Sequence, residues 1–181
     1  MFFGTSFVQI MPIFADILHS GERGYGLLIS ATGVGSVVGN LFISHFQQSR
    51  QLGLLMLSCA ALSAFSLVGF SLVTGTLSNA AGAFWLACFF AVLASAFSSV
   101  YLVSSMTVLQ LKVPDNLRGR VMGIHSITFS MIALGGLASG ALATKFSAPV
   151  AVVLGAVVVL LSVIWVTIRQ GEIISLDGSQ L

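Results

Sequence analysis

The side chains that could carry charge-based chemistry gather in one short stretch, residues 111–120, which reads LKVPDNLRGR. It holds four charged residues: Lys112, Asp115, Arg118 and Arg120. The flanking residues 51–110 and 121–144 contain no Asp, Glu, Lys or Arg. Asp115 and Arg118 stand three residues apart and can pair on a helix, although an exposed pair contributes only about 0.3–0.5 kcal/mol. So weak a pair suits a contact that is repeatedly made and broken. The alternative is that these cations only fix the orientation of the chain.

Two residues inside apolar stretches could take up a proton, namely Asp16 and His125. The hydrocarbon of a membrane makes an ionisable group costly, so such a residue is a functional hypothesis by default. Both residues lie near the end of an apolar run. The alternatives are therefore a solvated helix end for Asp16 and a local hydrogen bond near the lipid headgroups for His125.

The sequence carries no catalytic signature. It has no HExxH helix, no Walker A loop and no GxSxG turn. Cys59 and Cys88 fall inside apolar runs and show no metal-ligand spacing, so we interpret them as small buried hydrophobic residues. We therefore expect no enzymatic activity, no metal and no cofactor.

Composition indicates the surroundings in which these residues must be positioned. Of the 181 residues, 57% are hydrophobic and 7% are charged, against roughly 25% charged in an ordinary soluble domain. Too few polar groups remain to cover a water-facing surface, so the solvent must be mostly lipid. A net charge of +2 is too small to suggest a nucleic-acid partner. The apolar runs are continuous and about twice as long as the strands of a barrel, which predicts an all-α integral membrane protein.

A bilayer core takes about 20 apolar helical residues to cross, and by that measure six spans fit the chain. We predict them at about residues 1–18, 25–46, 52–73, 80–110, 120–144 and 149–168. Together they make one membrane domain, residues 1–169, followed by a short cytoplasmic tail, residues 170–181.

Two of the predicted spans contain glycines four residues apart. The pairs are Gly35 with Gly39 and Gly136 with Gly140. Small residues at this spacing let two helix backbones approach closely in lipid, which predicts helix packing, with a hinge or a substrate-facing groove as the alternative. The span at 80–110 is rich in serine, and these hydroxyls could either line a polar path or bond backbone carbonyls.

Counting basic residues predicts the orientation. With six spans, five of the seven Lys and Arg residues fall on the side of both termini: Arg50, Lys112, Arg118, Arg120 and Arg169. Arg23 and Lys145 fall on the other side. Because cytoplasmic loops carry the excess of positive charge, we expect both termini in the cytoplasm.

The string PDNLRGRVMG between the fourth and fifth predicted spans resembles the loop between spans ten and eleven of major facilitator superfamily transporters. The resemblance is best to bacterial drug and siderophore exporters, a subgroup that includes the enterobactin exporter. The segments ATGVGSVVGN, GLLML and SSMTVLQ support it. It implies that Asp115, Arg118, Gly119 and Arg120 form a cytoplasmic latch that stabilises one state of alternating access. The segment SHFQQSRQ departs from the family, because it lacks an Asp and keeps a single basic residue.

The resemblance further implies a function and its partners. Members of the superfamily are built from two six-span halves, and this chain is similar to the carboxy-terminal half. It would belong to a secondary active exporter of a small amphipathic molecule in the bacterial inner membrane. Its partners would be the lipid bilayer, the substrate, and an amino-terminal half or a second copy. The substrate-binding residues cannot be named. The alternative is a truncated or autonomous six-span subunit that assembles with another membrane protein and does not transport.

Overall fold

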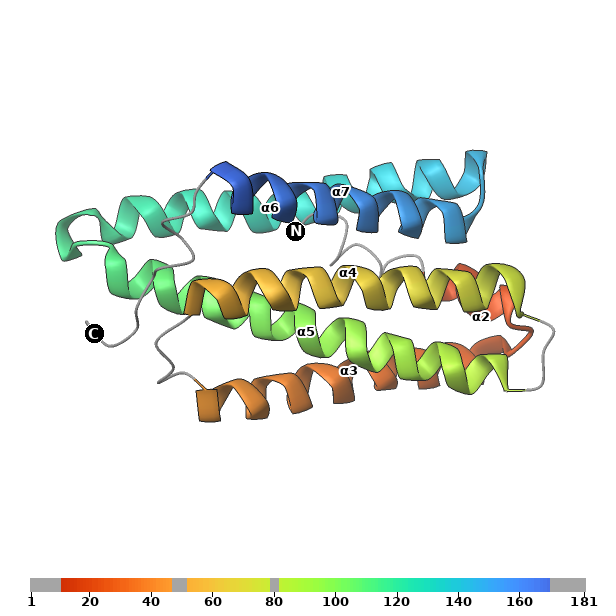
Figure 1. Ribbon diagram of the computed structural model, residues 1–181. Helices are drawn as coiled ribbons and strands as arrows, with labels where there is room; N and C mark the ends of the chain where they lie inside the picture. The colour runs from red at the N-terminus through yellow and green to blue at the C-terminus, as the bar shows by residue number, and fades with distance from the viewer. Residues whose placement is uncertain (1–10, 47–51, 79–81, 170–181) are drawn as a thin grey trace.

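The computed structural model describes residues 11–46, 52–78 and 82–169 (Figure 1). Within these ranges it does not describe the side chains of residues 44–46, 52, 110–112, 115, 116, 118 and 128–131. The described part is helical and contains α2 (Met11–Ile17), α3 (Gly21–Phe46), α4 (Leu52–Thr76), α5 (Ala83–Lys112), α6 (Asp115–Lys145) and α7 (Ala148–Arg169). Five of these, α3 to α7, are long and apolar enough to cross a membrane.

α3 and α6 begin before their predicted spans, at Gly21 rather than 25 and at Asp115 rather than 120, whereas α5 begins after its predicted start, at Ala83 rather than 80. The predicted polar loop after the first span is largely helical, because α3 begins at Gly21 and takes Glu22 into its first turn. An acidic residue there complements the unpaired amides of the helix start. Positive φ angles at His19 and Gly21 make the turn between α2 and α3.

The cationic stretch at 111–120 is also mostly helix. α5 ends at Lys112 and α6 begins at Asp115, so the connection shrinks to Val113 and Pro114. Pro114 has φ −55° and ψ 146°, an extended conformation that turns the chain just before the first helical residue. At the next junction, the Val150 amide approaches the Ser147 hydroxyl at 3.4 Å, in the position expected of a helix cap.

The first predicted span is described only in part. Its last residues form α2, while residues 1–10 lie outside the described ranges, as does the predicted tail at 170–181. Six spans therefore stays a prediction, and five is the number that the described residues support.

The helices pack in the order α3, α5, α4, α7 and α6 across the bundle, with α2 against α3 (Figure 1). Small residues allow α5 to lie between α3 and α4, because one of its faces presents buried alanines: Ala83, Ala87, Ala91 and Ala94. Larger side chains fill the core beside them, including Phe14 and Phe70, whose rings meet edge-on at 4.8 Å.

The α6–α7 hairpin joins the other helices through α4. The Ser71 hydroxyl on α4 donates a hydrogen bond to the Pro149 carbonyl at the start of α7, at 2.6 Å. Among the α6 side chains that the structure describes, the buried ones are Gly135, Gly136 and Ser139. All three lie in the second half of α6, and the described residues of its first half are half-buried or exposed.

Candidate functional site

The two glycines of α3 face α5 at close range. A Cβ added to Gly35 would overlap the Ser95 hydroxyl and the Val92 carbonyl oxygen. A Cβ added to Gly39 would lie 2.5 Å from the Ala96 carbonyl oxygen, nearer than real Cβ contacts come. Only glycine therefore allows this approach of the two backbones, which is the geometry that a GxxxG spacing favours.

Hydrogen bonds flank this contact on both sides. The Ser95 hydroxyl on α5 donates to the Thr32 carbonyl of α3 at 2.7 Å. One turn further along, the Ser99 hydroxyl donates to the Asn40 side-chain oxygen at 2.9 Å. In membrane proteins such inter-helix bonds contribute about 0.6 kcal/mol on average, so these two add modestly to the backbone packing.

The outer surface of α3 is divided lengthwise. We call its polar side the α3 strip, and it consists of Gly26, Ser30, Gly33, Ser36 and Asn40, interrupted by Val37. At 100° per residue these positions share one side of the outer surface, and the adjacent side, about 110° further round the helix, carries large exposed residues: Leu27, Val34, Val38 and Leu41. Gly26 and Gly33 have no atom within 4 Å of an added Cβ. Lipid suits the leucine and valine side, whereas hydroxyl and carboxamide groups at membrane depth suit water, a polar ligand or another helix.

Sequence reasoning did not single out Asn40. Its signal was present, because a carboxamide inside a span is uncommon and costly. What the sequence could not supply was the direction in which Asn40 faces. The serines of the fourth predicted span have two kinds of partner. Ser95 donates to the Thr32 carbonyl and Ser104 to the Val100 carbonyl, the latter at 2.8 Å, whereas Ser99 donates to the Asn40 side chain.

The predicted latch residues lie at the start of α6. Gly119 has open space around an added Cβ, and Arg120 is exposed. The side chains of Asp115 and Arg118 lie outside the description, so their pairing stays a prediction. The backbone there is ordered as a helix start, with the Leu117 amide donating to the Pro114 carbonyl at 2.9 Å.

The two proton-site predictions fall towards opposite ends of the bundle (Figure 1). Asp16 is exposed near the end of α2, beside the turn into α3. His125 is half-buried and lies ten residues after Asp115, which is about 15 Å along α6. It therefore lies further from the start of its helix than the sequence predicted, because α6 starts earlier than expected. The structure does not bring Asp16 and His125 into one site.

The second glycine pair differs from the first. Gly136 is buried, but a Cβ added to Gly140 would meet no atom within 4 Å. Gly119 and Gly123 on the same helix are equally open. The described residues thus provide no close partner for Gly140, and its role in packing stays a prediction.

In the described part of the chain, no group of three or more His, Cys, Asp or Glu residues could hold a metal ion. The arrangement offers a hydrogen-bonding wall on α3 and α5, set in a largely apolar bundle.

Comparison with protein families gives one match. The model described as Major Facilitator Superfamily matches residues 1–175. The comparisons with curated proteins and with solved structures returned no match.

Proposed function

Because the chain belongs to the Major Facilitator Superfamily, we propose that it supplies the carboxy-terminal half of the translocation bundle of a secondary active exporter. Membership makes it a multi-pass membrane protein of a transporter family. The match over residues 1–175 carries the proposal, since it includes every described helix. The direction of transport and the role as one half rest on the resemblance of PDNLRGRVMG to the loop that precedes span eleven in exporters.

We propose a small amphipathic molecule, such as a drug or a siderophore, as the substrate. The α3 strip offers the Asn40 carboxamide and the acceptor oxygens of Ser30 and Ser36, whose hydroxyls donate to the Gly26 and Gly33 carbonyls. Large apolar side chains lie beside these groups, and no charged residue is among them. Such a wall can hydrogen-bond a polar group while an apolar body rests on the hydrocarbon side chains. A highly charged substrate would lack a counter-charge there.

We also propose the bacterial inner membrane, with both termini in the cytoplasm. The junction between α5 and α6 and the end of α7 lie on one side of the bundle (Figure 1). They carry Lys112, Arg118, Arg120 and Arg169, while Lys145 lies at the opposite end. The positive-inside rule assigns the richer side to the cytoplasm. Neither catalysis nor a cofactor forms part of the proposed activity.

A second candidate is a subunit that binds another membrane protein without transporting. The open glycines of α6 favour it, because small residues without neighbours at membrane depth can receive a partner helix. Either an amino-terminal half or an unrelated membrane protein could pack against these glycines. A transport assay is therefore needed to distinguish the two functions.

The test is an accumulation assay in efflux-deficient bacteria. The chain is joined at its amino end to the amino-terminal half of a superfamily exporter, and cells are loaded with a panel of cationic dyes, antibiotics and siderophores. We expect reduced accumulation of at least one compound. A protonophore should restore accumulation, since the resemblance to superfamily exporters implies that transport is coupled to protons. Unchanged accumulation of every compound, with the fusion present in the membrane, would favour the non-transporting subunit.

A further inference from the structure

The exposed carboxamide of Asn40 on α3 has a fixed orientation, and Ser99 of α5 sets it. The Ser99 hydroxyl donates to the Asn40 Oδ1 at 2.9 Å, so the amide oxygen points towards α5. The Nδ2 group lies on the other branch of the same amide and carries two N–H donors. Among the described residues no acceptor bonds Nδ2, so both donors remain available on the exposed side of α3.

This pair lies within the hydrocarbon part of the membrane. Ser99 is three residues past the middle of the candidate span Ala83–Leu109, which is about 4.5 Å, and Asn40 is three residues before its own span ends at Ile43. Both positions therefore lie between the middle of the bilayer and the side of the α5–α6 junction. A polar group at such a depth faces the bundle interior or a water-filled cavity, because lipid offers its donors no acceptor.

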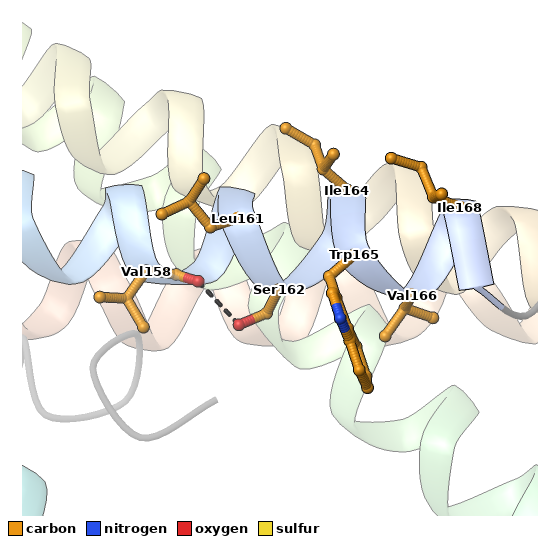
Figure 2. Close-up of a pocket in the computed structure, with 7 residues that line it drawn as sticks. All are labelled: Val158, Leu161, Ser162, Ile164, Trp165, Val166 and Ile168. Atoms are coloured by element: carbon orange, nitrogen blue, oxygen red, sulfur yellow. Dashed lines mark hydrogen bonds between the residues drawn. The ribbon is translucent and has the colours of Figure 1, made fainter.

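The outer side of α7, drawn in Figure 2, is a surface suited to lipid and differs from this one. Its exposed side chains are large and apolar, among them Leu161 and Ile164. The Ser162 hydroxyl donates to the Val158 carbonyl at 2.7 Å, which is the dashed line in the figure. This hydroxyl is thus satisfied within its own helix, as lipid contact requires.

The serines of the α3 strip are satisfied in the same way. The Ser30 and Ser36 hydroxyls donate at 2.8 Å to carbonyls four and three residues earlier in α3. Their oxygens can still accept a hydrogen bond, but their protons are in use. Of the described side chains in the strip, Asn40 is therefore the one that can donate to a bound molecule.

The part of α5 around Ser99 is also turned away from lipid. The exposed large hydrophobic residues of α5 are Trp85, Leu86 and Phe89, all in its first two turns. After Phe89 none of the described α5 side chains is exposed. The Asn40 donors thus lie beside a helix that presents no exposed apolar surface at this level.

We propose that Asn40 selects the substrate, a role that rests on the proposed transport function. Its Nδ2 donates to an acceptor oxygen of the substrate, and Ser99 is the positioning residue that keeps this donor facing the strip. The selected class is amphipathic molecules that carry a carbonyl oxygen at the edge of an apolar body. A molecule without the acceptor is disfavoured, because binding it would leave the covered amide unpaired.

Two lipophilic cations that differ at a single group provide the test. They are triphenylphosphonium ions bearing either a 4-acetylphenyl or a 4-ethylphenyl group, so that a carbonyl oxygen in one replaces the hydrogens of a methylene in the other. Efflux-deficient bacteria that produce the joined exporter are loaded with either ion, and initial efflux rates give KM and kcat. We expect a KM about fivefold lower for the acetyl ion, the equivalent of one net hydrogen bond of about 1 kcal/mol.

The ratio of the two KM values is compared between the parent and its variants, so that differences in lipid partitioning cancel. Asn40→Leu removes the donors at similar volume and should remove the fivefold preference. Ser99→Ala keeps the donors but lets the amide turn, so the preference should fall partway. Ser58→Ala is the control, because this exposed serine of α4 bonds the Leu55 carbonyl of its own helix, and the ratio should not change.

A merely structural role of the pair would change the efflux of both ions alike and leave their ratio unmoved. Equal KM values in the parent, or a ratio that Asn40→Leu leaves unchanged, would overturn the proposal while transport stands. If Asn40→Leu does not reach the membrane, an unchanged ratio in Ser99→Ala overturns it instead. Export of other panel compounds but of neither phosphonium ion also contradicts it. Export of nothing in the panel would refute the proposed function, and the role of Asn40 with it.

Discussion

At the scale of single residues, the neighbours of a glycine decide its role. Gly33 and Gly39 belong to the same helix and the same glycine-rich segment, but Gly39 contacts the α5 backbone and Gly33 faces open space. The spacing predicted packing for Gly35 and Gly39, and the structure places α5 against both. Sequence alone could not identify α5 as the partner, because a spacing defines a helix face without saying what covers it.

The first prediction compares two identical substitutions on α3. Gly39→Ala forces a methyl group against the Ala96 carbonyl and should lower the free energy of unfolding by about 1–3 kcal/mol. Gly33→Ala has room and should be neutral or stabilising, because alanine is the better helix former by up to about 1 kcal/mol. Thermal unfolding in detergent measures both. Equal losses in the two variants would show that α3 does not pack on α5 through Gly39.

The second prediction concerns the hydrogen bond between Ser99 and Asn40. A double-mutant cycle with Ser99→Ala and Asn40→Ala should give a coupling free energy of about 0.6 kcal/mol, the average for such pairs in a membrane protein. Denaturant unfolding of the two single variants and the double variant supplies the numbers. Strict additivity would mean that the two side chains do not interact in the folded chain.

At the scale of elements, the long apolar runs allowed the membrane spans to be predicted from the sequence. Predicted and observed helices agree closely at the carboxyl ends of α3, α6 and α7, which lie at Phe46, Lys145 and Arg169. The amino ends of α3 and α6 were placed too late, because charged residues were assigned to loops. Glu22 and Asp115 instead occupy first helical turns, where acidic groups stabilise the exposed amides. The same error made His125 appear closer to the start of its helix than it is.

The third prediction tests how the elements cross the membrane. Cys59 and Cys88 are first replaced by serine, and single cysteines are then introduced as Asn116→Cys and Leu77→Cys. The two positions lie at opposite ends of the bundle, near the α5–α6 junction and beyond the end of α4. An impermeant maleimide added to intact cells should label position 77, and position 116 only after lysis. The reverse pattern would invert the proposed orientation.

At the scale of the whole molecule, the described bundle is unevenly packed. α5 lies between α3 and α4, whereas α6 rests on α7 and none of the described residues in its first half is fully buried. Exposed residues such as Ile124, Ile127 and Leu137 require a lipid or protein cover. The sequence carries a partial signal of this imbalance, since α6 is the least apolar of the five candidate spans. It agrees with the proposal that the chain works beside a second set of spans.

The fourth prediction concerns the start of α6 in the joined transporter. Replacing Arg118 and Arg120 with alanine should impair efflux several-fold while membrane insertion stays normal, if these cations stabilise one state of the cycle. Lys145→Ala removes a cation from the other end of α6 and should leave efflux intact. Normal efflux by a well-expressed variant with both replacements would show that Arg118 and Arg120 only fix the orientation of the chain in the membrane.

Transport by purified protein in liposomes tests the proposed half-transporter most directly. Three preparations are compared: the chain alone, an amino-terminal six-span half alone, and the two joined, each with the compound that the cellular panel identifies. We predict flux for the joined protein only, driven by an imposed proton gradient. Equal flux by the chain alone, or none by a joined protein that is folded and inserted, would contradict the assignment of this chain as one half of a carrier.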